Sequence, residues 1–124
     1  MAFEGLEKIR VYVSAEAVGD KMWDEVARWE SFERWTLGKQ LVEAADSISA
    51  NIAESYGRHH PKDVVNFLYH ARGSLFETVS WINKARKRKL ITGPKAEELL
   101  ADLNRLAPQF NAYINSKRSR FDEH

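Results

Sequence analysis

The sequence predicts an all-α fold, an antiparallel up-and-down bundle of four helices in one domain over residues 1–124. Apolar residues recur at spacings of three and four in four long segments, and no segment shows the alternation of a β-strand. Two of the three prolines, Pro61 and Pro94, stand in turn-like stretches. Proline is favoured in the first turn of a helix, where its missing N–H would have no partner, so helices should begin near both residues. A chain of this length fits a single domain.

The first two helices are predicted over residues 6–28 and 33–56. The apolar stripe of the first helix is Val11, Ala15, Val18, Met22, Val26 and Trp29. The same spacing in the second helix joins Leu37, Leu41, Ala44, Ile48, Asn51 and Ser55. Because the second stripe ends in polar residues, this helix should carry polar groups on or beside its buried face.

The last two helices are predicted over residues 61–89 and 94–116, followed by a polar tail over 117–124 that should fray. The third helix has an unbroken heptad pattern of Val64, Leu68, Ala71, Leu75, Thr78, Ile82 and Ala85. The stripe of the fourth is Ala96, Leu99, Leu103, Leu106, Phe110 and Tyr113. Pro108 should kink the fourth helix because it removes one backbone hydrogen bond. Short turns between long helices predict antiparallel neighbours.

The first and third helices carry more apolar side chains than one buried stripe requires. This surplus predicts a second buried face and therefore a homo-oligomer; the alternative is one wide core stripe with aromatic residues at its edge. Buried aromatic side chains dominate the binding energy of protein interfaces. The candidate interface residues are Tyr12, Trp23, Phe67, Phe76 and Trp81.

Basic residues are concentrated in one part of a chain whose net charge is only +1. Residues 60–93 carry seven basic and two acidic side chains, whereas residues 1–30 carry four basic and seven acidic ones. Clustered cations on a rigid scaffold can bind phosphate backbones without sequence preference, so RNA or DNA is a candidate partner. The alternative is a solvated helix end, where cations complement the helix dipole. The candidate phosphate-binding residues are Lys84, Arg86, Lys87, Arg88 and Lys89 at one end, with Arg58, Lys62, Lys117, Arg118 and Arg120 at the other.

The sequence predicts no enzyme, no metal site, no cofactor and no membrane span. Cysteine is absent, which excludes disulfides and thiolate chemistry and favours a cytoplasmic location, as does the lack of a signal-peptide pattern. No Glu is followed by His three positions later, which excludes the usual di-iron site of helical bundles. Arg118 and His124 match the Arg–His spacing of HEPN-type ribonucleases, so an RNA-processing enzyme of that type is kept as an alternative.

Two motif blocks, spaced as in a known family, carry a resemblance that extends over residues 6–115. The first block is Phe32, Trp35, Leu37, Gln40, Leu41, Ala45, Ser47, Ile48, Asn51, Ile52, Ala53 and Glu54, and the second is Phe67, Leu68, Ala71, Gly73, Ser74, Leu75 and Glu77. They resemble a small four-helix bundle family. That family includes proteins encoded in intervening sequences of bacterial large-subunit ribosomal RNA genes and the accessory variability determinant of diversity-generating retroelements.

The resemblance implies a homopentameric ring without enzymatic activity. For the retroelement members it also implies binding to nucleic acid and to a reverse transcriptase. This chain departs from the family pattern at Val42 and Glu43, where basic residues are common, and at Ser55, where the family has glycine. The departure at Val42 and Glu43 removes positive charge from the second helix.

Polar residues of the two motif blocks form a unit across the second and third helices. This unit is Ser47, Asn51, Glu54, Ser74 and Glu77. We expect it to fix the register between two helices that apolar stripes alone would let slide, with a ligand site as the alternative. The predicted function is a non-enzymatic binding or scaffold protein that is accessory to RNA or DNA transactions. A pure oligomerisation module without nucleic-acid contact is a further alternative.

Overall fold

The computed structural model describes the backbone of residues 4–123 and the side chains of residues 5–119. Its elements are a 3-10 helix η1 (Glu4–Lys8), α1 (Arg10–Val26), a short α2 (Ser31–Glu33), a π-helical segment η2 (Arg34–Gly38), α3 (Lys39–Tyr56), α4 (Pro61–Lys87) and α5 (Gly93–Glu123). Residues 4–123 contain no strand, which confirms the all-α class.

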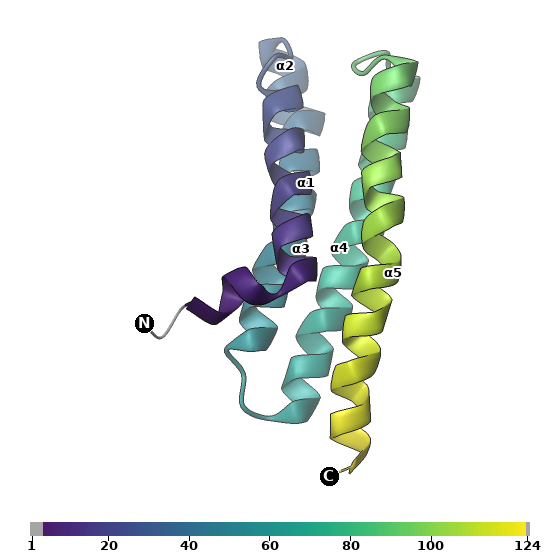
Figure 1. Ribbon diagram of the computed structural model, residues 1–124. Helices are drawn as coiled ribbons and strands as arrows, with labels where there is room; N and C mark the ends of the chain where they lie inside the picture. The colour runs from purple at the N-terminus through teal and green to yellow at the C-terminus, as the bar shows by residue number, and fades with distance from the viewer. Residues whose placement is uncertain (1–3, 124) are drawn as a thin grey trace.

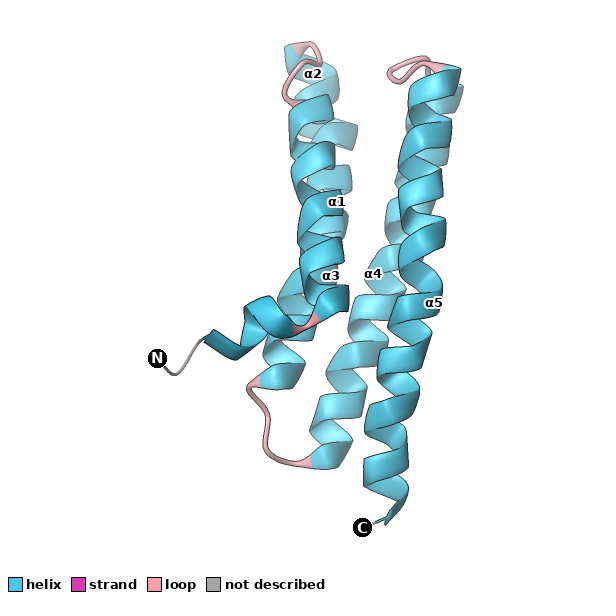
Figure 2. Cartoon of the chain, viewed as in Figure 1, coloured by secondary structure: helices cyan, strands magenta, loops and turns pink. Residues whose placement is uncertain are grey.

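The four long helices contact one another in the cyclic order α1, α3, α4, α5. Figure 1 shows the link from α1 to α3 and the turn from α4 to α5 at one end of the molecule, with the turn from α3 to α4 and the C-terminus at the other. The irregular backbone of the described chain lies mostly at these two ends, apart from a short break before α1 (Figure 2). The cyclic order places α1 diagonally opposite α4 and makes the α1–α3 side the opposite of the α4–α5 side.

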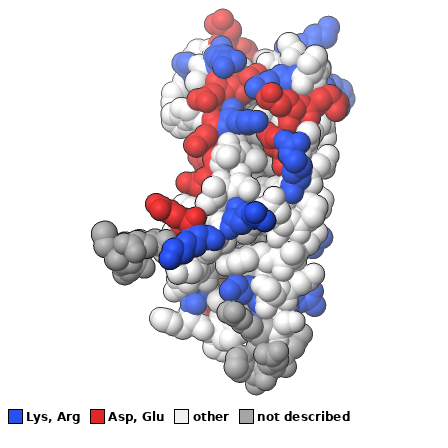
Figure 3. Space-filling model, viewed as in Figure 1, with Lys and Arg blue, Asp and Glu red and all other residues white. Residues whose placement is uncertain are grey.

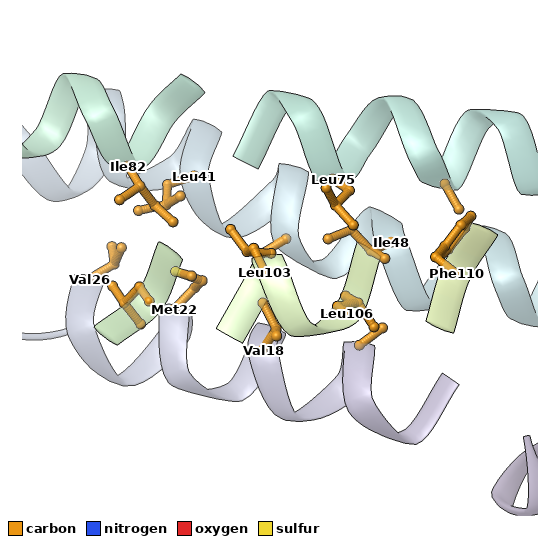
Figure 4. Packing of buried hydrophobic residues seen from close by; sticks show 14 of the residues in the cluster. Val18, Met22, Val26, Leu41, Ile48, Leu75, Ile82, Leu103, Leu106 and Phe110 are labelled. Carbon is orange, nitrogen blue, oxygen red and sulfur yellow. The ribbon is translucent and has the colours of Figure 1, made fainter. Parts of the chain in front are cut away.

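The core is built from the apolar stripes that the periodicity indicates. All six stripe residues of α1 and its C-terminal turn are buried, as are Leu68, Leu75 and Ile82 of α4. Figure 4 shows Leu41 beside Ile82 and Ile48 beside Leu75, with residues of α1 and α5 closing the core around them. These apolar pairs define the register between α3 and α4.

The helix ends differ from the sequence expectation in two places. Helix α1 begins at Arg10 because Ile9 is extended, with φ −86° and ψ 105°, and η1 turns away from the bundle. Helix α5 continues to Glu123, through a segment that the sequence predicts to fray. In this segment the Ser116 hydroxyl donates to the Tyr113 carbonyl at 2.8 Å, and the Lys117 ammonium lies 5.1 Å from the Tyr113 ring.

The second predicted helix is not a continuous α-helix. Ser31–Glu33 is followed by the wider π turn of Arg34–Gly38 before α3 begins. The Thr36 hydroxyl donates to the Phe32 carbonyl at 2.7 Å within this segment. π turns inside helices are frequent at functional sites, so the surface around Arg34–Gly38 is a candidate for binding.

Candidate functional site

The basic run lies where α4 ends, and the turn that ends it is unusual. The Leu90 N–H donates to the Ala85 carbonyl at 2.9 Å and the Lys89 N–H donates to the Arg86 carbonyl at 3.0 Å. This pattern requires a left-handed residue after the helix, a position that is usually glycine. Here it is Lys89, with φ 64°. A lysine therefore occupies a position where glycine would be more stable.

The five candidate cations of this end fall into two groups. The Lys84 ammonium lies 4.9 Å from the Trp81 ring, and the Arg86 guanidinium pairs with the Glu97 carboxylate at 2.8 Å. Lys87, Arg88 and Lys89 are exposed, and within the described part of the chain they have no ion-pair partner. Three adjacent cations at this turn are therefore free to bind an anion.

The second basic cluster lies around the α3–α4 turn. Arg58, His59 and Lys117 line a pocket of about 300 Å³ between that turn and α5. The Arg58 guanidinium pairs with the Glu54 carboxylate at 2.5 Å and stacks 4.6 Å from the Phe67 ring, so its charge is already partly balanced. Lys62 and Arg118 are exposed, while the side chain of Arg120 lies outside the described residues.

Charge is unevenly spread along the bundle. In the view of Figure 3, acidic side chains gather on the upper part of the molecule, interleaved with basic ones. The lower part of the same face shows basic side chains with little acidic surface. The structure thus brings Arg58 and Lys117 together at the lower end, whereas the Lys84–Lys89 run lies at the upper end beside acidic residues such as Glu97.

The polar unit of α3 and α4 forms its hydrogen bonds within single helices. Asn51 Nδ2 donates to the Ser47 carbonyl at 2.8 Å, and the Ser74 hydroxyl donates to the His70 carbonyl at 3.2 Å. Trp81 Nε1 donates to the Glu77 carboxylate at 3.2 Å. Asn51, Ser74 and Glu77 also line an open groove of about 550 Å³ between the two helices. No hydrogen bond of this unit crosses from α3 to α4 among the described residues.

A polar contact that the sequence reading missed joins α3 to α1. The buried Ser49 hydroxyl donates to Glu16 Oε2 at 2.6 Å, and the Tyr12 hydroxyl approaches the other Glu16 oxygen at 3.4 Å. Asp46 lies nearby on α3, and its pKa is raised by partial burial and by the negative charges of Glu16 and Asp20. The α1–α3 side therefore carries an acidic cluster without a basic partner among the described residues.

The candidate interface aromatics are not equally available. Trp23 and Phe76 are 62% and 61% exposed, whereas Tyr12, Phe67 and Trp81 are half-buried. Trp23 lines an apolar groove of about 410 Å³ together with Trp35 and Val42. Trp35, which is 68% exposed, belongs to the first resemblance block but is not among the predicted interface residues, because the π turn that carries it has no periodic signature.

The described residues contain no group of three or more His, Asp or Glu side chains that could hold a metal ion. The Arg–His pair of the ribonuclease alternative involves an exposed Arg118 on α5 and His124, which lies outside the described residues. Across the described chain, no helix combines the length and apolar character needed to cross a membrane.

A family model described as 23S rRNA-intervening sequence protein matches residues 7–112. The chain belongs to this family. The predicted resemblance to intervening-sequence proteins is confirmed, and the family's description names no enzymatic reaction. A search of curated proteins found no match. The family match includes all of α1, α3 and α4 and most of α5, so it contains the Lys84–Lys89 run but excludes Lys117 and Arg118.

Proposed function

We propose that this chain is a non-enzymatic binding protein that holds nucleic-acid phosphates at Lys87, Arg88 and Lys89. In this proposal the chain forms an antiparallel up-and-down bundle, and five copies assemble into a ring. The observation that carries the proposal is the set of three exposed cations that have no ion-pair partner among the described residues. The backbone of Lys89 supports the proposal further. A charged residue at a strained backbone position, where glycine would cost less, suggests that its charge has a function.

The proposed ring would strengthen a cationic surface that is modest on one protomer. Each copy would contribute the same three cations, and the potentials of neighbouring copies add. The number five rests on the family resemblance alone. Five copies of the 14.3 kDa chain would have a mass of about 72 kDa, which light scattering coupled to size exclusion measures directly.

The proposed partner is RNA or DNA, recognised through its backbone. The name of the matched family links it to ribosomal RNA. A reverse transcriptase or another protein partner is implied by the resemblance to retroelement accessory proteins. The absence of cysteine accords with a cytoplasmic location for such a protein.

Mobility-shift titrations at low and moderate salt test the nucleic-acid proposal. The probes are a generic DNA duplex and an RNA hairpin of unrelated sequence, which distinguish the two backbones. Binding should weaken steeply with salt, and Lys87→Glu with Arg88→Glu should weaken it for every sequence. Each phosphate contact that is lost should reduce the salt slope by about one.

Arg10→Glu is the matched control, because Arg10 is an exposed cation on α1, far from the α4 end. It should leave binding close to that of the unmodified protein. The proposal would be contradicted if binding changed neither with salt concentration nor with the charge reversals at Lys87 and Arg88. That result would favour the second candidate function, an oligomerisation module without nucleic-acid contact. Lys84 and Arg86 support this candidate, because both already interact with residues of their own chain.

A further inference from the structure

The outer face of α4 carries a second seam that no other helix of the described residues covers. Tyr69, Gly73, Phe76 and Ser80 are all exposed and follow one another at spacings of four, three and four. At about 100° per residue, this seam is centred about 140° around α4 from the buried stripe of Leu68, Ala71, Leu75 and Ile82. Tyr69 and Gly73 also line the open groove between α3 and α4. The spacing is that of a helix surface suited to packing against another helix.

Gly73 has no role in packing within the protomer. A Cβ atom built on Gly73 meets nothing within 4 Å. Glycine inside a helix costs about 1 kcal/mol relative to alanine, so a neighbour would be expected to justify it. Because no described residue of this chain lies against Gly73, its position between Tyr69 and Phe76 suits the close approach of a helix from another molecule.

The second surface is the apolar groove of about 410 Å³ on the α1–α3 side. Trp23 and Trp35 line it together with Val26, Gly38 and Val42. The π turn of η2 carries Trp35, and no residue of the described chain fills the groove. Two large aromatic side chains that are more than half exposed mark this groove as a surface for a partner.

These two surfaces lie on opposite sides of the bundle, and an acidic cluster lies on the side of one while an unpaired cation lies beside the other. The groove itself is lined by Arg34, Lys39 and Glu43 among its charged residues. The same side of the bundle also carries Glu16, Asp20 and Asp46, which form no ion pair with a described residue. On α4, the Arg72 guanidinium lies 5.7 Å from the Phe76 ring and likewise has no ion-pair partner in the described part of the chain. The acidic cluster on one side and Arg72 on the other therefore each lack an ion-pair partner among the described residues, and one chain cannot bring its own two sides together.

We propose that the Tyr69–Gly73–Phe76–Ser80 seam of one copy packs head to tail against the Trp23–Trp35 groove of the next copy. This inference rests on the proposed homo-oligomer and names the two surfaces that form its contact. Each groove is completed by α4 of a neighbouring copy, and Arg72 of that α4 approaches the acidic cluster. A contact between two different surfaces repeats from copy to copy and closes into a ring when the rotation permits.

The absence of cysteine makes disulfide trapping a clean test. Leu41 lies beside Ile82, so Glu43 on the groove and Ser80 on the seam are at the same level of the bundle. Glu43→Cys and Ser80→Cys are prepared separately, mixed and oxidised. The mixture should give a covalent dimer, whereas each variant alone should not. The double variant should give a ladder of crosslinked species that ends at the number of subunits in the ring.

Ala112→Cys, an exposed position on α5 away from both surfaces, is the control and should not crosslink with either variant. Circular dichroism checks that all variants keep the helical fold. Covalent dimers from each single variant alone would show a self-complementary contact and overturn the inference. An oligomeric mass by light scattering without crosslinks in the mixture would overturn it but leave the proposed assembly standing. A mass near that of one chain would remove the assembly itself.

Discussion

The Ser49 hydroxyl on α3 donates a hydrogen bond of 2.6 Å to the Glu16 carboxylate on α1. Ser49 is buried, so the bond lies at the junction of the two helices and not in open solvent. A Cβ on neighbouring Gly19 would stand 2.7 Å from the Asp46 carboxylate, so a larger residue there would require that side chain to move. A polar contact of this kind makes one pairing of α1 and α3 more favourable than its alternatives.

Replacing Ser49 by alanine should lower the free energy of unfolding by about 1 kcal/mol, because a hydrogen bond to a charged acceptor is lost. Urea unfolding followed by circular dichroism measures the change. Ser47→Ala is the matched control, since the Ser47 hydroxyl makes no hydrogen bond to a described residue. Equal losses in the two variants would show that the Ser49 bond contributes nothing specific.

The second prediction concerns the carboxyl of Asp46, whose pKa is raised above its ordinary value of 3.8. The folded state therefore binds a proton more tightly than the unfolded state does. The contribution of Asp46 to stability is therefore fully present below pH 3.8 and is lost as the pH rises through the raised pKa of the folded state. At neutral pH Asp46→Asn should stabilise the protein, by about 0.5 kcal/mol because solvent screens the repulsion.

That gain should disappear as the pH is lowered towards 3.8, where Asp46 itself becomes neutral. Thermal unfolding at several pH values measures both effects. Asp24→Asn removes a charge from an exposed position on α1 and should change stability little at any pH. A destabilised Asp46→Asn variant at neutral pH would contradict the repulsion described for this cluster.

The third prediction separates the backbone of Lys89 from its charge. Lys89→Gly should stabilise the protein by about 1 kcal/mol, because glycine adopts φ 64° without steric cost. If Lys89 holds a phosphate, the same variant should bind nucleic acid more weakly. Lys89→Ala removes the charge but keeps the strain, so it should weaken binding without the gain in melting temperature. A Gly variant that is more stable and binds equally well would remove Lys89 from the proposed interface.

The sequence predicts the four-helix fold well because the burial of a helix face is a local, periodic property. Val11, Met22, Leu68 and Leu103 are buried as their spacing indicates. The π turn before α3 could not be read in this way. Gly38 at the end of this turn lies against Val26 and Trp29, and such a contact between separate elements leaves no periodic signal in the sequence.

The sequence identifies the basic residues of the candidate site, but it does not show their ion-pair partners or their backbone conformation. The Lys84–Lys89 run is visible in the sequence, yet Arg86 is neutralised by Glu97, which follows the next turn. The left-handed backbone of Lys89 is also invisible to a periodic pattern. Ser49 was overlooked because Ser47 and Asn51 lie closer to the heptad positions, although Ser49 is the residue that reaches a neighbouring helix.

The last prediction compares two adjacent residues on α4. Phe76 is 61% exposed, whereas Leu75 is 5% exposed and packs in the core. Leu75→Glu should unfold the protomer, because a buried carboxylate without a partner costs several kcal/mol. Phe76→Glu should leave the helical content unchanged but reduce the mass of the assembly, since it places a charge in the proposed contact. Light scattering and circular dichroism on both variants measure the two effects. Loss of helix in Phe76→Glu would place this side chain in the protomer core, and an unchanged mass would exclude it from the contact between copies.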